Sequence, residues 1–166
     1  MAFVRDGDSR IVWDPGMVPS DDSILEPLAA LGVAPGDVTD VVLSHHHPDH
    51  TIRAGLFPSA RTHDHWAWYR GDEWVDRPCE GFEVSPSVRL MHTPGHTPQC
   101  LTTLVSTGEE VAALTHLWWF EGGPAEDPHA VDPVGLHGGR ERVLRLASLI
   151  VPGHGTPFRP SASTPT

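Results

Sequence analysis

Four histidines and one aspartate crowd into the nine-residue stretch LSHHHPDHT, residues 43–51. Imidazole and carboxylate groups are ligands suited to zinc, and a catalytic zinc keeps one coordination position open for water. If the preceding VVLS is a strand, His45 and His47 share a face and can converge on one point where the strand ends. Asp49 and His50 follow in the turn and can aim at a second point close by. One loop can therefore contribute to two adjacent metal sites.

Two further histidines stand in proline and glycine turns that follow expected strands. TPGHTPQ places His96 after a strand that ends at His92, and VPGHGTP places His154 in a second turn of this kind. Side chains at strand ends project from a rigid scaffold into a shared cleft, where distant parts of a sequence can assemble one site. These turns can supply the ligands that the first loop lacks.

The elements that must position these loops are strands mixed with helices. A short amphipathic helix is expected from about Ser23 to Gly32, and a last helix over 138–148, followed by a short strand in LIVPGHG. This alternation within one domain predicts an α/β layered fold. The expected strands before the last helix are 3–5, 11–14, 41–44, 60–63, 88–92, 101–105 and 111–115.

Composition limits the class of protein. The chain has 166 residues with 39% hydrophobic content, which predicts one domain over 1–160, and the polar tail at 161–166 is expected to be disordered. A net charge of −11 disfavours nucleic acid and anionic membranes as partners. No stretch is long enough to span a membrane, and the first residues lack a signal-peptide pattern, so a cytoplasmic location is expected. Cys79 and Cys100 lack the spacing of a thiolate metal site.

Taken together, the motifs resemble those of the metallo-β-lactamase superfamily. HHHPDH matches its H-x-H-x-D-H signature, TPGHT and PGHG supply two later histidines, and DPG at 14–16 resembles its early strand-ending motif. Within the superfamily, LFPSAR, TPGHTPQ and VPGHGTPF are most similar to the branch named for metallo-β-lactamase domain-containing protein 1. The resemblance implies a four-layer αββα sandwich with a two-metal site at one sheet edge. The N-terminal part is short for this fold, which is compatible with an exposed sheet edge or with a homodimer that covers it.

His116 marks a departure from the family pattern. The family usually has an aspartate that bridges both metals at the end of a later strand, whereas VAALTHLWW has His116 at the corresponding place. A neutral imidazole normally binds one ion through one nitrogen, so the metal pair would lose its bridge. His116 is therefore a candidate additional ligand.

The resemblance also implies roles for the remaining residues. Asp49 is both a metal ligand and the catalytic residue that orients the attacking hydroxide, while His46 points away from the ligands and receives no role. Trp118 and Trp119, directly after His116, are expected to bind substrate. One or two zinc ions are expected, with iron or manganese as alternatives. The implied ligands are His45, His47 and His96 for the first ion, Asp49, His50 and His154 for the second, and His116 in addition.

A metal centre of this kind predicts hydrolysis. Zinc lowers the pKa of bound water to about 7 and polarises a carbonyl or phosphoryl oxygen. The leading hypothesis is a hydrolase that uses metal-bound hydroxide on a small ester, thioester or lactone. Alternatives are a phosphodiesterase or ribonuclease, which would need a basic strip that the scattered arginines do not indicate, a mononuclear iron dioxygenase, and a metal-binding homologue without catalysis. A third histidine cluster, His63 to His65 in THDHW, is expected to be a surface loop.

Overall fold

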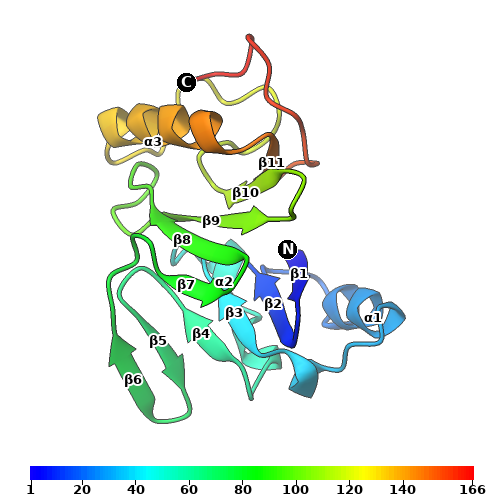
Figure 1. Ribbon diagram of the computed structural model, residues 1–166. Helices are drawn as coiled ribbons and strands as arrows, with labels where there is room; N and C mark the ends of the chain where they lie inside the picture. The colour runs from blue at the N-terminus through cyan, green and yellow to red at the C-terminus, as the bar shows by residue number, and fades with distance from the viewer. The chain divides into compact units, whose positions relative to one another are not determined.

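The computed structural model describes all 166 residues and contains two compact units, Met1–Pro78 and Cys79–Thr166. Each unit has its own β-sheet, as Figure 1 shows. No helix in the structure combines the length and the apolar character that a membrane crossing requires.

The first unit contains a six-stranded sheet whose strands lie in sequence order, β1 to β6. Strands β2, β3 and β4 are parallel, and the outer strands are antiparallel to their neighbours. Because parallel strands end at the same edge, the residues after β2, β3 and β4 are brought together. The elements are β1 (Ala2–Asp6), β2 (Ser9–Trp13), α1 (Asp22–Ala30), β3 (Asp40–Val42), α2 (Pro48–Thr51), β4 (Arg61–His63), β5 (Ala67–Arg70) and β6 (Glu73–Asp76), with 3₁₀ turns at Pro35–Asp37 and Ala54–Leu56.

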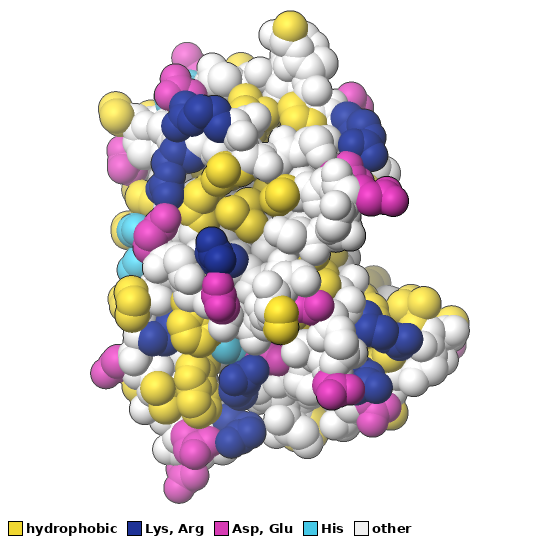
Figure 2. All heavy atoms as spheres, in the orientation of Figure 1, with side chains coloured by type: hydrophobic (Ala, Val, Ile, Leu, Met, Phe, Trp, Pro, Cys, Tyr) yellow, Lys and Arg dark blue, Asp and Glu magenta, His cyan; other side chains and the backbone are white.

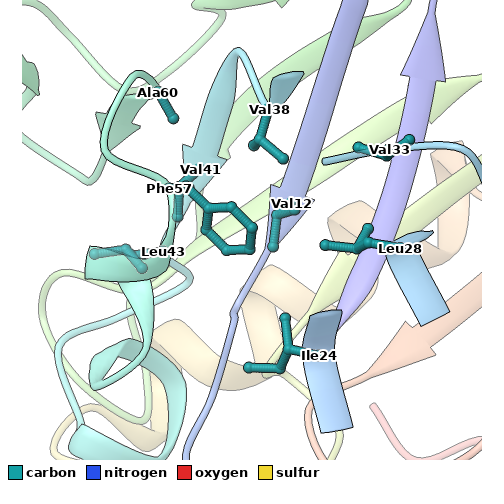
Figure 3. Close-up of a cluster of buried hydrophobic side chains, with 9 residues drawn as sticks. All are labelled: Val12, Ile24, Leu28, Val33, Val38, Val41, Leu43, Phe57 and Ala60. Carbon is teal, nitrogen blue, oxygen red and sulfur yellow. The ribbon is translucent and has the colours of Figure 1, made fainter. Parts of the chain in front are cut away.

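Helix α1 packs its apolar face on this sheet. Ile24 and Leu28, four residues apart, lie on one side of the helix and are buried with Val12 of β2 and Val41 of β3. Figure 3 shows these side chains pointing toward one another around Phe57. Each fully buried aliphatic side chain contributes about 1.5–3 kcal/mol, so this cluster holds the strands whose ends carry the first histidine loop.

The second unit contains a five-stranded sheet in the order β11-β10-β9-β8-β7. Strands β10 and β11 are parallel, whereas β9 is antiparallel to both β8 and β10. Strands β8, β10 and β11 therefore run in the same direction and end at the same edge. The elements are β7 (Glu83–Ser85), β8 (Val88–His92), β9 (Leu101–Ser106), β10 (Val111–Thr115), α3 (Pro133–Leu146) and β11 (Leu149–Pro152).

Helix α3 covers one face of the second sheet (Figure 1). Its Leu136 and Val143 are buried with Trp118, Ile150 and Phe158. The helix begins at Pro133, five residues before the expected start, because the Asp132 side chain caps it by accepting a bond from Gly135 N at 2.9 Å. Glycines in the first turns hide the apolar pattern. One of them, Gly139, is needed because an added Cβ would lie 2.9 Å from Leu117 Cδ2.

The expected strands are all present, and the α/β fold class is confirmed. Strands β5, β6 and β7 were not predicted. The β5–β6 hairpin turns at Gly71, whose φ is +60°, and it leaves Trp74 63% exposed, so it lacks the buried alternation that reveals a strand. In the C-terminal segment the Pro165 carbonyl accepts a bond from Trp118 Nε1 at 2.8 Å. The expected disorder of 161–166 stays a prediction.

Candidate metal centre

The first histidine loop begins where β3 ends and runs into the short helix α2. Pro48 occupies the first position of α2, where its missing N–H costs nothing, and His47 precedes it in an extended conformation. His45 and His50 are buried, whereas His47 and Asp49 are exposed. The break from strand to helix thus turns four side chains of one short segment in different directions.

The side chains of this loop meet in two pairs. His45 Nε2 lies 3.0 Å from His47 Nδ1, and His50 Nε2 lies 3.4 Å from Asp49 Oδ2. The rings of His45 and His50 are neighbours, with centroids 4.3 Å apart. The two pairs are the two groupings that the sequence predicts for adjacent metal sites.

Asp14 holds both buried histidines of the loop. Its buried carboxylate accepts bonds from Ser44 N at 2.7 Å, from Ser44 Oγ at 2.6 Å and from His50 Nδ1 at 2.7 Å. Asp14 has a φ of +45°, in the left-handed region that aspartate tolerates better than most residues. Gly16 N donates to His50 O at 3.1 Å, so the DPG motif binds the loop through backbone and side chain.

These bonds fix which nitrogen of each ring carries the proton. A carboxylate only accepts, so the Ser44 hydroxyl donates to Asp14 and must accept from His45 Nδ1, 3.0 Å away. His50 Nδ1 likewise donates to Asp14. In both rings Nε2 is therefore the nitrogen whose lone pair suits a metal. The DPG motif is recognisable in the sequence, but it did not predict a role for Asp14 at the site.

His46 lies on the other side of the loop. Its Nε2 is 3.1 Å from Asp64 Oδ2, and its ring lies 5.2 Å from that of Trp66. Asp64 also accepts bonds from Trp66 N, Ala67 N and Tyr69 Oη, so it shapes the turn between β4 and β5. Burial and the hydrogen bond to Asp64 raise the pKa of Tyr69.

The THDHW segment is not the expected surface loop throughout, because its first residues end strand β4 and only Trp66 is exposed. His63 and Asp64 are both buried, and His63 Nε2 lies 2.8 Å from Asp40 Oδ1. Burial lowers the pKa of His63, so neutral His63 donates to the carboxylate. Burial opposes ionisation of Asp40, but bonds from His63 and Thr39 and the charge of Arg61 keep its pKa below the usual value. The hydrogen bond between His63 and Asp40 joins β3 to β4, so the role of these two residues is structural.

The second unit presents its three candidate ligands at one edge of its sheet. His96 follows β8, His116 follows β10 and His154 follows β11, and these three strands run in the same direction. The rings of His96 and His116 have centroids 4.4 Å apart, and His116 Nε2 lies 3.1 Å from His154 Nε2. His116 thus contacts both neighbours. Gly153 is required here, because an added Cβ would collide with the His116 ring.

Asp127 is the residue at this edge that sequence reasoning missed. Its Oδ2 lies 2.8 Å from His96 Nδ1, and both side chains are buried. The potential ligand atoms of His96, His116 and Asp127 all lie within 4.8 Å of one another. Asp127 comes from an irregular loop 31 residues further along the chain, so no spacing could have indicated it.

The two tryptophans after His116 have different environments. Trp118 is completely buried in the core of the second unit, so it is not placed to touch a substrate. Trp119 is partly exposed, and its ring stacks on His129 with centroids 5.8 Å apart. It also lies 6.2 Å from the rings of His96 and His116. Of the two residues expected at the substrate site, Trp119 alone borders the histidines.

A family profile described as the metallo-beta-lactamase superfamily matches residues 1–157. The chain belongs to this superfamily. Rat metallo-beta-lactamase domain-containing protein 1 is 37% identical over 158 residues, which cover 90% of this chain and 62% of the relative. The similarity confirms the predicted branch of the metallo-beta-lactamase superfamily, although the chain spans less than two thirds of that relative's length.

Solved structures confirm the metallo-beta-lactamase fold. A Thermotoga maritima protein described as a candidate metallo-beta-lactamase has a TM-score of 0.76 at 24% identity, covering 95% of this chain and 86% of that one. An N-acyl homoserine lactone hydrolase, with N-hexanoyl-L-homoserine bound at its catalytic metal centre, has a TM-score of 0.71 at 21% identity, covering 92% and 79%. At these identities the likeness shows the fold, and function has to be inferred from the site.

Proposed function

We propose that this chain is a metal-dependent hydrolase, with zinc as the metal and a small ester, thioester or lactone as the substrate. The observation that carries the proposal is the pairing of ligand atoms in the first histidine loop, His45 with His47 and Asp49 with His50. Membership in the metallo-beta-lactamase superfamily supports it.

The donor set fits a divalent metal. His45, His50 and His96 each direct Nδ1 at an oxygen, of Ser44, Asp14 and Asp127 respectively, which leaves Nε2 as the coordinating atom. Nitrogen and carboxylate ligands without a thiolate suit zinc, and they also suit iron. A divalent ion held there supplies Lewis acidity and lowers the pKa of a coordinated water to about 7.

The family pattern assigns the ligands to two ions. We propose His45, His47 and His96 for the first, Asp49, His50 and His154 for the second, and His116 at the position of the bridging aspartate. Asp49 is the proposed catalytic residue. Its side chain is 43% exposed, so its carboxylate can accept a hydrogen bond from the attacking water while it contacts His50.

Trp119 supports a substrate with an apolar portion. Its ring and that of His129 form a flat stacked pair beside the histidines, and such a surface suits an acyl chain or a ring. The lactone hydrolase among the structural neighbours binds a product with a hexanoyl chain. An acyl lactone or a short acyl ester is therefore the first substrate class to test.

The distribution of charge argues against a nucleic acid substrate. On the face that Figure 2 shows, acidic side chains lie among the arginine side chains. Many arginines pair with carboxylates of their own unit, which lowers the local positive charge. These pairs are Arg53–Asp21, Arg61–Asp40, Arg70–Glu73, Arg89–Glu83, Arg142–Glu80 and Arg159–Glu110.

The proposal is tested by elemental analysis of protein purified without added metal, combined with a panel of acyl lactone, ester, thioester and phosphodiester substrates. We expect zinc and activity on the acyl substrates. Asp49→Ala should lose that activity, whereas His46→Ala, the matched control on the outer side of the loop, should keep most of it. Equal losses in the two variants, activity on phosphodiesters alone, or iron as the metal would each overturn part of the proposal.

A further inference from the structure

We propose that Asp127 is a positioning residue that fixes His96 for metal binding. The inference rests on the proposed function, because it takes His96 to be a metal ligand. Asp127 Oδ2 lies 2.8 Å from His96 Nδ1, and the Asp127 side chain is 1% exposed. No residue of the H-x-H-x-D-H loop or of the two glycine turns provides this carboxylate.

The hydrogen bond determines the tautomer of His96. The carboxylate of Asp127 only accepts, so Nδ1 of His96 carries the proton and Nε2 keeps its lone pair. A carboxylate behind a ligating imidazole also raises the basicity of the ring and fixes its orientation. In the first unit Asp14 stands in the same relation to His50, with a distance of 2.7 Å.

The other oxygen of Asp127 holds its own loop. Oδ1 accepts a bond from His129 N at 2.8 Å, and Ala130 N donates to Asp127 O at 3.1 Å. The same turn stacks the His129 ring on Trp119. One carboxylate thus connects a candidate metal ligand to the aromatic pair proposed to contact the substrate.

The chain on both sides of Asp127 is anchored, so the carboxylate has a defined position. Before it, the buried Arg140 side chain donates to Pro124 O and Ala125 O, each at 2.7 Å. After it, Val131 N and Asp132 N donate to Gly95 O at 2.9 and 3.0 Å, which joins this loop to the one that carries His96. Gly95 is required there, because an added Cβ would lie 2.8 Å from Leu136 Cα.

Asp127 also places a carboxylate close to the position where this chain lacks one. His116 stands at the place of the family's bridging aspartate, and its ring centroid is 4.4 Å from that of His96. The Asp127 carboxylate, which is hydrogen-bonded to His96, partly replaces the negative charge that a bridging aspartate would supply. In this position Asp127 changes the properties of His96 as a ligand without itself binding the metal.

The decisive variant is Asp127→Asn, which keeps the shape of the side chain. An amide has one acceptor oxygen, whereas His96 Nδ1–H and His129 N–H both need one, so one of the two bonds must fail. If the amide nitrogen faces His96, Nδ1 must become the acceptor and the proton moves to Nε2, the metal-binding atom. Asp132→Asn is the matched control, because Asp132 caps α3 five residues away without bonding His96.

Two measurements test the proposal. In metal-free protein, nitrogen-15 NMR of the histidine rings should show His96 protonated at Nδ1 in the wild type and in Asp132→Asn, and a larger Nε2-protonated fraction in Asp127→Asn. Zinc titration by calorimetry should show affinity about 10- to 100-fold weaker for Asp127→Asn than for the wild type. Asp127→Ala should weaken zinc binding by at least as much.

The outcomes separate this proposal from the proposed function. Zinc affinity and tautomer unchanged in Asp127→Asn would overturn the positioning role. If Asp127→Asn bound one zinc ion fewer, rather than binding zinc more weakly, Asp127 would be a direct ligand. That result would also overturn the positioning role. A wild type that binds no zinc would contradict the proposed function. The NMR comparison with Asp127→Asn would then still show whether Asp127 determines the tautomer of His96.

Discussion

Replacing Asp14 tests how the first histidine loop is held. Asp14→Ala removes the acceptor of three buried bonds, from Ser44 N, Ser44 Oγ and His50 Nδ1. Hydrogen bonds to charged groups contribute about 1.5–3 kcal/mol each. The alanine must also adopt a φ near +45°, which costs an ordinary residue about 1–2 kcal/mol. With the lower figure for each bond and for the backbone, we expect the free energy of unfolding to fall by about 5.5 kcal/mol.

The assay is urea unfolding of metal-free protein, followed by tryptophan fluorescence, so that lost metal binding does not add to the effect. Asp14→Asn tolerates the backbone conformation and keeps one acceptor oxygen, so its loss should be intermediate. Ser44→Ala removes one of the three bonds to the Asp14 carboxylate and should cost about 1.5–3 kcal/mol. Asp8→Ala, in the exposed turn between β1 and β2, should stay within about 0.5 kcal/mol of wild type. If Asp14→Ala were no less stable than Asp8→Ala, the reasoning would be refuted.

Three other predictions follow from the site and from the buried pair in the first sheet. Chelation should lower the melting temperature, because it leaves clustered imidazole and carboxylate groups uncompensated; an unchanged melting curve in demonstrably metal-free protein would contradict this. The wild type should bind two ions unequally, and His116→Asp should tighten the weaker binding step in calorimetry by restoring a bridging carboxylate. His63 has a lowered pKa when folded, so its contribution to stability is complete above about pH 6.5 and is lost as the pH falls below it. In metal-free protein, the stability difference between wild type and His63→Gln should therefore decrease from pH 7 to pH 5, and a constant difference would show that His63 titrates normally.

Local patterns were sufficient for the histidine loops and for all strands except β5, β6 and β7. The loop after β3 was recognisable because its candidate ligands lie within a few residues, and the two glycine turns follow predicted strands. The start of α3 could not be predicted, since its first turns contain glycines that serve close packing rather than an apolar face.

Contacts between segments that are distant in the sequence could not be predicted from it. The role of Asp14 depends on the parallel pairing of β2 with β3, and that of Asp127 depends on an irregular loop held by Arg140. Trp118 and Trp119 are adjacent and identical in type, so only the packing of the second unit shows that one is core and the other borders the histidines.

The single carboxylate behind the first loop makes the two histidines thermodynamically linked. Asp14 binds His50 directly and reaches His45 through the Ser44 hydroxyl, and the family pattern gives these rings to different ions. An ion that draws electron density from either ring strengthens that ring's bond to the shared group and alters the bond to the other. Linkage is reciprocal, so the affinity at each position depends on occupancy of the other by the same factor. Cooperativity between the ions would then arise in the scaffold, independently of any bridging ligand.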